Sequence, residues 1–382
     1  MMKRKLRFIA VIVCLSLWLP AGVQAAPRLS SQYYCVVDRE TGQCILGQNA
    51  AVKRPMASTT KMMTAILAVE YAGLDETAVV SSNADRTPEY TIGLRAGQRI
   101  TVSELLKAAL IRSANDAAVV LAEYVAGDEQ LFAYLMSKKA CLIGAPNTRF
   151  QNASGLPADN HYSTAYDLAQ IGRYALTKPY IDELVGTAST LFQHPGYQQP
   201  LTINNTNAGL LTGYPGADGI KTGTTDAAGK CLVASAVRKD RGLITVVLKS
   251  GDRLGDTVKL LNYGFNEATH EKIIDHAEIF KTLSVNNSDE SAAIVPAEDL
   301  WLWMGDKSAG NIEKRVRLNY NLDAPLKQGE VLGEMDLYMY GFMVRSVALV
   351  NLNEVDRKDW FIQRIIKHII SLPKRNNTDN KE

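Results

Sequence analysis

A serine and a lysine lie three positions apart in the segment MASTTKMMTAILAVE, residues 56–70. Residues three apart lie on the same face of a helix, so the Ser58 hydroxyl and the Lys61 amine could meet. A serine hydroxyl is a poor nucleophile until a base removes its proton. A lysine amine acts as that base only when burial or a neighbouring cation lowers its pKa. We therefore predict that Ser58 is an activated nucleophile and that Lys61 is its base.

Two further short polar patterns follow this pair in the chain. They are Ser113-Ala-Asn115 and Lys221-Thr222-Gly223. A Ser-x-x-Lys pattern alone is expected about once in a chain of this length. Ser371-Leu-Pro-Lys374 is a second copy, which Pro373 excludes from helical geometry. The three patterns together are far more specific, and Lys221 is a like charge that could lower the pKa of Lys61.

The elements that must position these residues are helices followed by strands. The sequence predicts a hairpin over 32–48, a helix over 58–71, and two helical runs over 101–126 that a polar stretch at 112–116 interrupts. Loop residues can reach a buried site at such an interruption. Residues 218–250 are predicted to form three strands joined by two turns. Helices first and adjacent antiparallel strands later favour an α+β fold.

The first 25 residues have the layout of a secretory signal peptide. Four basic residues precede an apolar run over 8–19, and small residues lead to a predicted cleavage site after Ala25. An uncleaved membrane anchor is the alternative, although the apolar run is short for a bilayer span. The mature protein is therefore predicted to be exported.

The sequence changes in character towards its C-terminus. Short apolar runs separated by polar turns predict a small β-rich domain over 275–355. The tail, residues 356–382, places five isoleucines on one helical face and polar or basic residues on the other. We predict that residues 360–375 lie in an anionic membrane interface. The alternative is a helix docked on its own protein or on a second subunit.

The composition argues against some classes of protein. The formal net charge is +2 and the isoelectric point is about 8.1, so no nucleic-acid partner is expected. The five histidines show no paired spacing of metal ligands, and neither a metal nor another cofactor is expected. Cys35 and Cys44 flank a predicted turn, where a cross-strand disulfide and two buried free thiols both fit the sequence.

The ordered set of Ser-x-x-Lys, Ser-x-Asn and Lys-Thr-Gly resembles that of serine β-lactamases and penicillin-binding proteins. The closer resemblance is to the low-molecular-mass penicillin-binding proteins that are D-alanyl-D-alanine carboxypeptidases, peptidase family S11. Other segments similar to that family are VVDRETGQCIL, NTRFQNASGL, HYSTAYDLA, GADGIKTGTTDAAGKCLVASA, RLGDTVKLLNYGF and NLDAPLKQGEVLGEM. The resemblance implies a serine β-lactamase/DD-peptidase-like α+β domain over 26–270, with an antiparallel sheet and helices, followed by the family's β-rich C-terminal domain over 275–355.

The resemblance also implies a role for each motif residue. Ser58 would form an acyl-enzyme with Lys61 as the base. Ser113 would relay a proton to the leaving amine, and Asn115 would hold the substrate's backbone amide. The backbone N–H groups of Ser58 and Thr224 would form the oxyanion hole. The substrate and its terminal carboxylate would be bound by the Lys-Thr-Gly segment and a downstream arginine, namely Lys221, Thr222, Gly223, Thr224 and Arg253.

The implied activity is removal of the terminal D-alanine from peptidoglycan pentapeptides, with binding of β-lactam antibiotics, at the outer face of the cytoplasmic membrane or in the periplasm or cell-wall space. Two alternatives stay open: a DD-endopeptidase that cuts cross-links, and a catalytically impaired protein that binds peptidoglycan or penicillin. A β-lactamase is disfavoured because Glu123, Glu129 and Glu183 lie outside the Glu-x-x-Asn setting of the class A enzymes. Thr224 departs from the family, which often has His or an aromatic residue after Lys-Thr-Gly.

Overall fold

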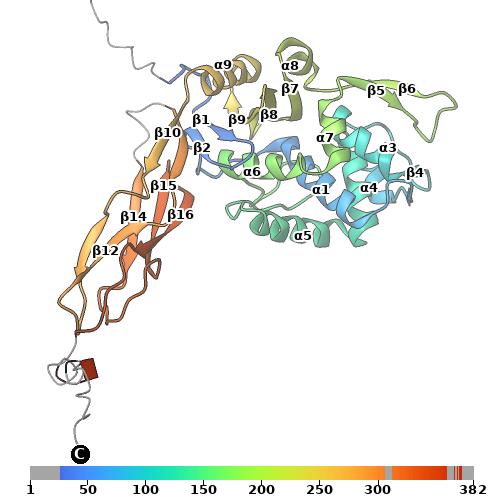
Figure 1. Ribbon diagram of the computed structural model, residues 1–382. Coiled ribbons are helices and arrows are strands. Elements are labelled where there is room, and N and C mark those ends of the chain that lie inside the picture. The colour runs from blue at the N-terminus through green and yellow to red at the C-terminus, as the bar shows by residue number, and fades with distance from the viewer. Residues whose placement is uncertain (1–25, 306–311, 359–364, 366–367, 369, 372–382) are drawn as a thin grey trace, which may run out of the picture.

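A five-stranded antiparallel sheet lies at the centre of the first part of the chain (Figure 1). The structure is a computed structural model and describes residues 26–305, 312–358, 365, 368, 370 and 371. The strand order is β2-β1-β9-β8-β7. These strands are β1 (Tyr33–Asp38), β2 (Cys44–Gln48), β7 (Ala217–Thr225), β8 (Gly229–Arg238) and β9 (Arg241–Ser250). The predicted hairpin and the predicted run of three adjacent strands are both confirmed.

Alternation along the strands buries both faces of this sheet. Cys35 and Val37 of β1 belong to one core, whereas Tyr34 and Val36 belong to a second core on the opposite face. The helices that pack into the first core are α1 (Lys61–Tyr71), α3 (Val102–Lys107), α4 (Asn115–Ala126), α5 (Glu129–Leu142), α6 (Ala165–Ala175) and α7 (Pro179–Gly186). The helices that pack into the second are α8 (Ala208–Gly213) and α9 (Arg253–Asn266). The sheet is therefore the middle of three layers.

Capping residues set where several helices begin. Thr101, Asp128 and Thr164 each accept a hydrogen bond from a backbone N–H in the first turn of α3, α5 and α6. Short elements connect the helices at the edge of the cluster. They are β3 (Thr77–Val79), α2 (Ser82–Asp85), β4 (Arg99–Thr101), β5 (Ser189–Phe192) and β6 (Leu201–Asn204).

Two segments that carry motif residues depart from plain helix. Residues 57–60 form the 3-10 turn η1 (Ala57–Thr60), and α1 begins only at Lys61. The predicted interruption within 101–126 is present, because the π-helical turn η2 (Ala108–Arg112) stops at Ser113. The φ of Ser113 is 68°, in the left-handed region, and α4 restarts at Asn115. The chain therefore turns sharply at two of the three motifs.

The C-terminal part is built of strands, as predicted. Its main sheet has the order β11-β12-β16-β15-β14 and its own core, and a separate pair joins β10 to β13. The strands are β10 (Thr269–Ile274), β11 (Lys281–Ser284), β12 (Ser291–Pro296), β13 (Leu300–Met304), β14 (Glu313–Leu318), β15 (Val331–Met339) and β16 (Phe342–Asn351). The fold is α+β followed by a β-rich domain. The predicted residue boundaries between them stay a prediction.

The two parts of the chain contact each other near the β1–β2 turn (Figure 1). The Gln43 side-chain amide donates to the Trp303 carbonyl oxygen at 2.7 Å and accepts from the Trp303 N–H at 3.0 Å. The rings of Tyr166 and Phe342 stack with centroids 3.7 Å apart. The β-rich domain is thus fixed to the end of the sheet where β1 turns into β2.

The cysteines and the two chain ends complete the comparison with the sequence. Cys35 lies opposite Gly47 and Cys44 opposite Val37, and both thiols are free and buried. The predicted signal peptide and the interfacial stretch at 360–375 fall outside the described residues, apart from the few between 365 and 371 given above. Within the described residues, no helix has the length and apolarity needed to cross a membrane.

Candidate active site

Ser58 and Lys61 meet where the 3-10 turn η1 passes into α1. The Lys61 Nζ atom lies 3.0 Å from the Ser58 Oγ atom, which is the contact that the three-residue spacing predicts. Lys61 is fully buried although it carries an amine. Burial lowers the pKa of Lys61 well below its usual value, and the charge of Lys221 lowers it further. Both effects favour the neutral form of the amine.

The other partners of Lys61 Nζ are both oxygen acceptors. The Asn115 Oδ1 atom lies at 2.6 Å and the Ser154 carbonyl oxygen at 2.7 Å. Neither of these two oxygens can donate a hydrogen bond, so the amine must give each of them an N–H. A neutral amine has two such protons and one lone pair. Its lone pair then remains to accept the Ser58 O–H, which is the geometry that a general base requires.

The Ser154 carbonyl is held by a turn over residues 152–155. Asn152 Oδ1 accepts from the Gly155 N–H at 2.7 Å. Gly155 has a φ of +91°, and a Cβ there would lie 2.0 Å from the Ala57 carbonyl oxygen. Only glycine fits at this position beside the 3-10 turn η1, which carries Ser58. The segment NASGL predicts the turn from sequence. Nothing in that segment indicates that a backbone carbonyl would accept a hydrogen bond from Lys61.

Ser113 contacts the second lysine rather than capping the helix that follows. Its Oγ atom accepts a hydrogen bond from Lys221 Nζ at 2.8 Å, whereas no side chain caps the N-terminus of α4. Lys221 is 1 % exposed. Its burial, followed by the charge of Arg253, lowers the pKa of Lys221 to about 7. Lys221 can therefore hold or release a proton beside this hydroxyl near neutral pH.

Strand β7 passes directly beside the 3-10 turn η1, which carries Ser58. A Cβ on Gly223 would lie 3.0 Å from the Ser58 backbone nitrogen, the Met56 carbonyl oxygen and the Ala57 Cβ atom. Any side chain at position 223 would push the strand and the turn apart. The glycine of the Lys-Thr-Gly pattern therefore permits the close approach that two converging backbone donors need.

The remaining predicted residues lie on β7 or contact it. Arg253 Nη1, at the start of α9, donates to Thr224 Oγ1 at 2.9 Å and to the Gly223 carbonyl oxygen at 3.3 Å. Thr222 Oγ1 donates to Thr206 Oγ1 at 2.6 Å. The structure thus connects all the predicted residues in one site, and Thr206 is a neighbour that sequence reasoning missed.

Comparison with known proteins agrees with this geometry. The family model described as D-alanyl-D-alanine carboxypeptidase matches residues 21–251. The chain belongs to this family. A second model, the C-terminal domain of penicillin-binding protein 5, matches residues 269–357 and accounts for the β-rich domain.

Relatives of this carboxypeptidase are found among both sequences and solved structures. D-alanyl-D-alanine carboxypeptidase DacF of Bacillus subtilis is 31 % identical over 314 residues, covering 79 % of this chain and 80 % of DacF. DacC of Escherichia coli is 31 % identical over 369 residues, covering 88 % and 87 %. The crystal structure of DacD from Francisella tularensis matches with a TM-score of 0.69 at 26 % identity, covering 87 % of this chain and 95 % of that one.

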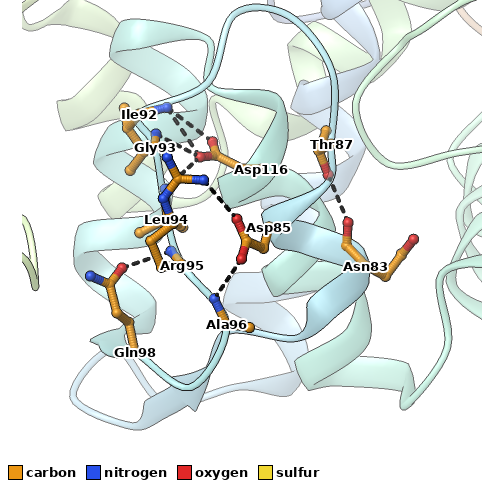
Figure 2. Close-up of polar contacts among 10 residues, drawn as sticks. All are labelled: Asn83, Asp85, Thr87, Ile92, Gly93, Leu94, Arg95, Ala96, Gln98 and Asp116. Atoms are coloured by element: carbon orange, nitrogen blue, oxygen red, sulfur yellow. Dashed lines mark hydrogen bonds and ion pairs between the residues drawn. The ribbon is translucent and has the colours of Figure 1, made fainter.

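A buried carboxylate orders the loop that faces the active site of this carboxypeptidase. Figure 2 shows Asp116, which accepts from the N–H groups of Ile92 at 3.1 Å, Gly93 at 3.0 Å and Leu94 at 3.1 Å. The carbonyl oxygens just before this segment hold Asn115: its Nδ2 donates to residues 88 and 89, and its N–H to residue 90. Asp116 therefore positions Asn115 through the loop.

Asp116→Asn is expected to lower the rate of acylation about tenfold, equivalent to about 1.4 kcal/mol. The negative charge of Asp116 raises the pKa of Lys61, so its removal lowers that pKa further. Acylation needs the neutral amine, so its rate falls at low pH, where the amine is protonated. This fall, the acid limb of the pH–rate profile, should therefore move to lower pH in the variant. Stopped-flow acylation by a labelled penicillin at a series of pH values measures both effects.

The matched control is Asp85→Asn. Asp85 holds the far side of the same loop through Arg95 Nη1 at 3.0 Å and the Ala96 N–H at 3.1 Å (Figure 2). It has no contact with Asn115, so neither the rate nor the acid limb should change. An Asp116→Asn enzyme with an unmoved acid limb would show that Asp116 acts on the fold alone.

One side-chain cluster in the β-rich domain has the composition of a metal site. Asp275, His276 and Asp299 offer ligand atoms within 4.8 Å of one another. Lys272 Nζ, however, forms ion pairs with Asp275 at 3.1 Å and with Asp299 at 3.0 Å. This lysine supplies the positive charge that the two carboxylates need, and the cluster is explained without an ion. The sequence-based expectation of no metal and no other cofactor stays a prediction.

Proposed function

We propose that the protein removes the terminal D-alanine from peptidoglycan pentapeptides through an acyl-enzyme on Ser58. The observation that carries this proposal is the buried Lys61 amine, 3.0 Å from the Ser58 Oγ atom and bound otherwise to two oxygen acceptors. Those contacts favour a neutral base aimed at a hydroxyl. Family membership supplies the reaction, and the geometry supports the assignment of its residues.

In the acylation step, Ser58 Oγ attacks the carbonyl carbon of the last peptide bond while Lys61 Nζ takes the hydroxyl proton. The N–H groups of Ser58 and Thr224 stabilise the oxyanion. The C–N bond then breaks, Ser113 delivers its hydroxyl proton to the leaving amine nitrogen of D-alanine, and the proton that Lys61 took passes to Ser113, which leaves Lys61 neutral for the next step. Lys221, which contacts the Ser113 hydroxyl at 2.8 Å, positions that proton. The products are an ester on Ser58 and free D-alanine.

In the deacylation step, a water molecule attacks the ester carbonyl and gives a proton to Lys61. The bond between the acyl carbon and Ser58 Oγ breaks, and the proton returns to the serine oxygen. The shortened peptide leaves as a carboxylic acid. A β-lactam presents a comparable carbonyl and carboxylate to the same groups, and penicillin therefore acylates Ser58.

The cationic side of the site supports recognition of a free carboxylate. Lys221 lies on β7 with the hydroxyls of Thr222 and Thr224, and Arg253 of α9 contacts Thr224 at 2.9 Å. The purified protein should release D-alanine from a pentapeptide ending in D-Ala-D-Ala and should leave the C-terminal amide of the same peptide nearly untouched. Faster cleavage of cross-linked dimers than of the pentapeptide would instead favour the endopeptidase alternative.

Arg253→Gln is expected to raise KM for that pentapeptide about tenfold or more, with a smaller change in kcat, because a hydrogen bond to a charged group contributes roughly 1.5–3 kcal/mol. The preference for carboxylate over amide should shrink in parallel. Steady-state D-alanine release measures both quantities. Lys230→Gln is the control, since Lys230 is an exposed cation paired with Thr224 across the strands. Equal losses in the two variants would contradict a specific role for Arg253.

The location proposed for the protein is the outer face of the cytoplasmic membrane. The signal-like N-terminus and the family membership support export, and the amphipathic pattern at 360–375 supports attachment to anionic lipid. The full mature chain should float with vesicles that contain anionic phospholipid, and a chain ending at residue 358 should not. Equal flotation of the two would contradict attachment through the tail.

A further inference from the structure

A cavity of about 860 Å³ lies between the two parts of the molecule, at the end of the sheet away from the active site. Its walls are the β1–β2 turn, the C-terminal end of α6, the β8–β9 turn, and the β10–β13 pair. Thr222 in the active site pairs with Leu232 of β8, whereas the cavity begins at Val237. At ~3.3 Å per residue along β8, the two places are separated by about 17 Å. The cavity is therefore not part of the reaction site.

The charges around the cavity balance. Three carboxylates and three guanidinium groups line it, namely Asp38, Glu40, Asp240, Arg39, Arg173 and Arg241. The arginines are already engaged: Arg39 pairs with Asp182 and Asp218, and Arg173 donates to the carbonyl oxygens of Arg39 and Glu40. Arg241 lies over the Trp303 ring, 3.3 Å from its centroid, and donates to the Gly264 carbonyl oxygen. Neither an anion nor a cation is favoured by such a wall. A neutral ligand with many hydroxyl or amide groups fits it better.

Aromatic rings form the other wall and continue onto the surface. Trp303 and His270 lie opposite each other on β13 and β10, with ring centroids 4.8 Å apart. Strand alternation places Trp301 on the same face, 5.7 Å from His270, while Leu302 is buried on the other face. Trp301 is 50 % exposed. A large aromatic ring left open to solvent beside a polar cavity is typical of a binding surface.

Sugar rings match both walls. The C–H groups on one side of a pyranose pack against an aromatic face such as the exposed Trp301 ring, and the hydroxyl and N-acetyl groups donate hydrogen bonds to the carboxylates. The volume is within the range of about 300–1,000 Å³ that holds small organic ligands. Polymers longer than the cavity would continue over Trp301.

We propose that this cavity and the adjoining exposed ring of Trp301 bind the glycan strand of peptidoglycan, a neutral polymer of N-acetylated sugars. The four residues between the sugar and the scissile bond span only about 14 Å when extended. The bound sugar is therefore not the one that carries the reacting peptide. The site holds the enzyme on the polymer while Ser58 acts on a peptide from elsewhere along the wall.

The experiment is binding of the purified protein to glycan strands from which all peptides have been removed, by co-sedimentation, and to N-acetylglucosamine oligomers, by tryptophan fluorescence. Wild type should bind both, and Trp301→Ala should weaken binding at least tenfold. Tyr320→Ala removes another exposed aromatic ring of the same domain and should bind as wild type does. Both variants should release D-alanine from soluble pentapeptide at the wild-type rate, which shows that they are folded.

Failure of the wild-type protein to bind peptide-free glycan would overturn the proposal, as would Trp301→Ala binding with wild-type affinity. Neither result depends on the reaction, because the glycan carries no peptide. Equal weakening by Tyr320→Ala would also contradict the assignment, since it would indicate nonspecific adhesion to the β-rich domain.

Discussion

Lys61→Met should lower the rate constant for acylation by labelled penicillin by about 10²- to 10⁴-fold, the range that a general base contributes. Lys61 is fully buried within α1, and Met has a similar length without an amine. The substitution therefore removes the proton acceptor beside Ser58 Oγ with little change in packing. Rapid quenching of the reaction, followed by mass spectrometry of the acylated protein, measures the rate.

Two companion variants separate basicity from charge and from fold. Lys61→Arg keeps a cation that cannot be deprotonated, so it should be as slow as Lys61→Met. Lys139→Met removes a different half-buried lysine, one paired with Glu70 at 2.8 Å away from the motifs, and should acylate normally. Acylation by Lys61→Met at the wild-type rate would exclude Lys61 as the base.

The pH dependence of wild-type acylation follows from the same amine. Because burial and the Lys221 charge lower the pKa of Lys61, the amine is neutral above that lowered value and protonated below it. The rate should therefore fall as pH drops through the lowered pKa, and this acid limb should be absent from the residual rate of Lys61→Met. If Lys61→Met kept this acid limb, a group other than Lys61 would have to cause it.

Local pattern was enough to predict the parts of the fold and site that depend on neighbouring residues. The three-residue spacing brought Ser58 and Lys61 together, because helical geometry is set within a turn. The apolar runs in β8 and β9, bounded by turns, identified adjacent strands, since a strand covered on both faces has to be apolar along its length. The polar break before Asn115 marked the loop that reaches the site.

Contacts between distant segments could not be derived in this way. The Ser154 carbonyl reaches Lys61 across 93 positions of the chain, and a carbonyl leaves no signal in the side-chain pattern. The bond between Lys221 and Ser113 spans 108 positions and depends on the left-handed turn at Ser113. Resemblance to the family supplied the proximity of these motifs, but it gave no indication of Thr206 or of the cavity beside Trp303.

Ser58→Ala is the substitution with the largest expected effect, because it removes the atom that forms the covalent bond. Neither penicillin nor peptide should then acylate the protein, and D-alanine release should fall to the background of the peptide alone. The fold should be kept, since alanine is smaller than serine at this half-buried position of η1 and Lys61 retains Asn115 and Ser154 as partners. Unchanged thermal unfolding would confirm this.

The most direct test of the account combines D-alanine release with the position of the label. Wild type and Ser58→Ala are each given the pentapeptide and, separately, labelled penicillin, and the labelled protein is digested and mapped by mass spectrometry. The account predicts D-alanine from wild type alone and a single penicilloyl adduct on the peptide that contains Ser58. D-Alanine release by Ser58→Ala at the wild-type rate, or an adduct on a different residue, would contradict it.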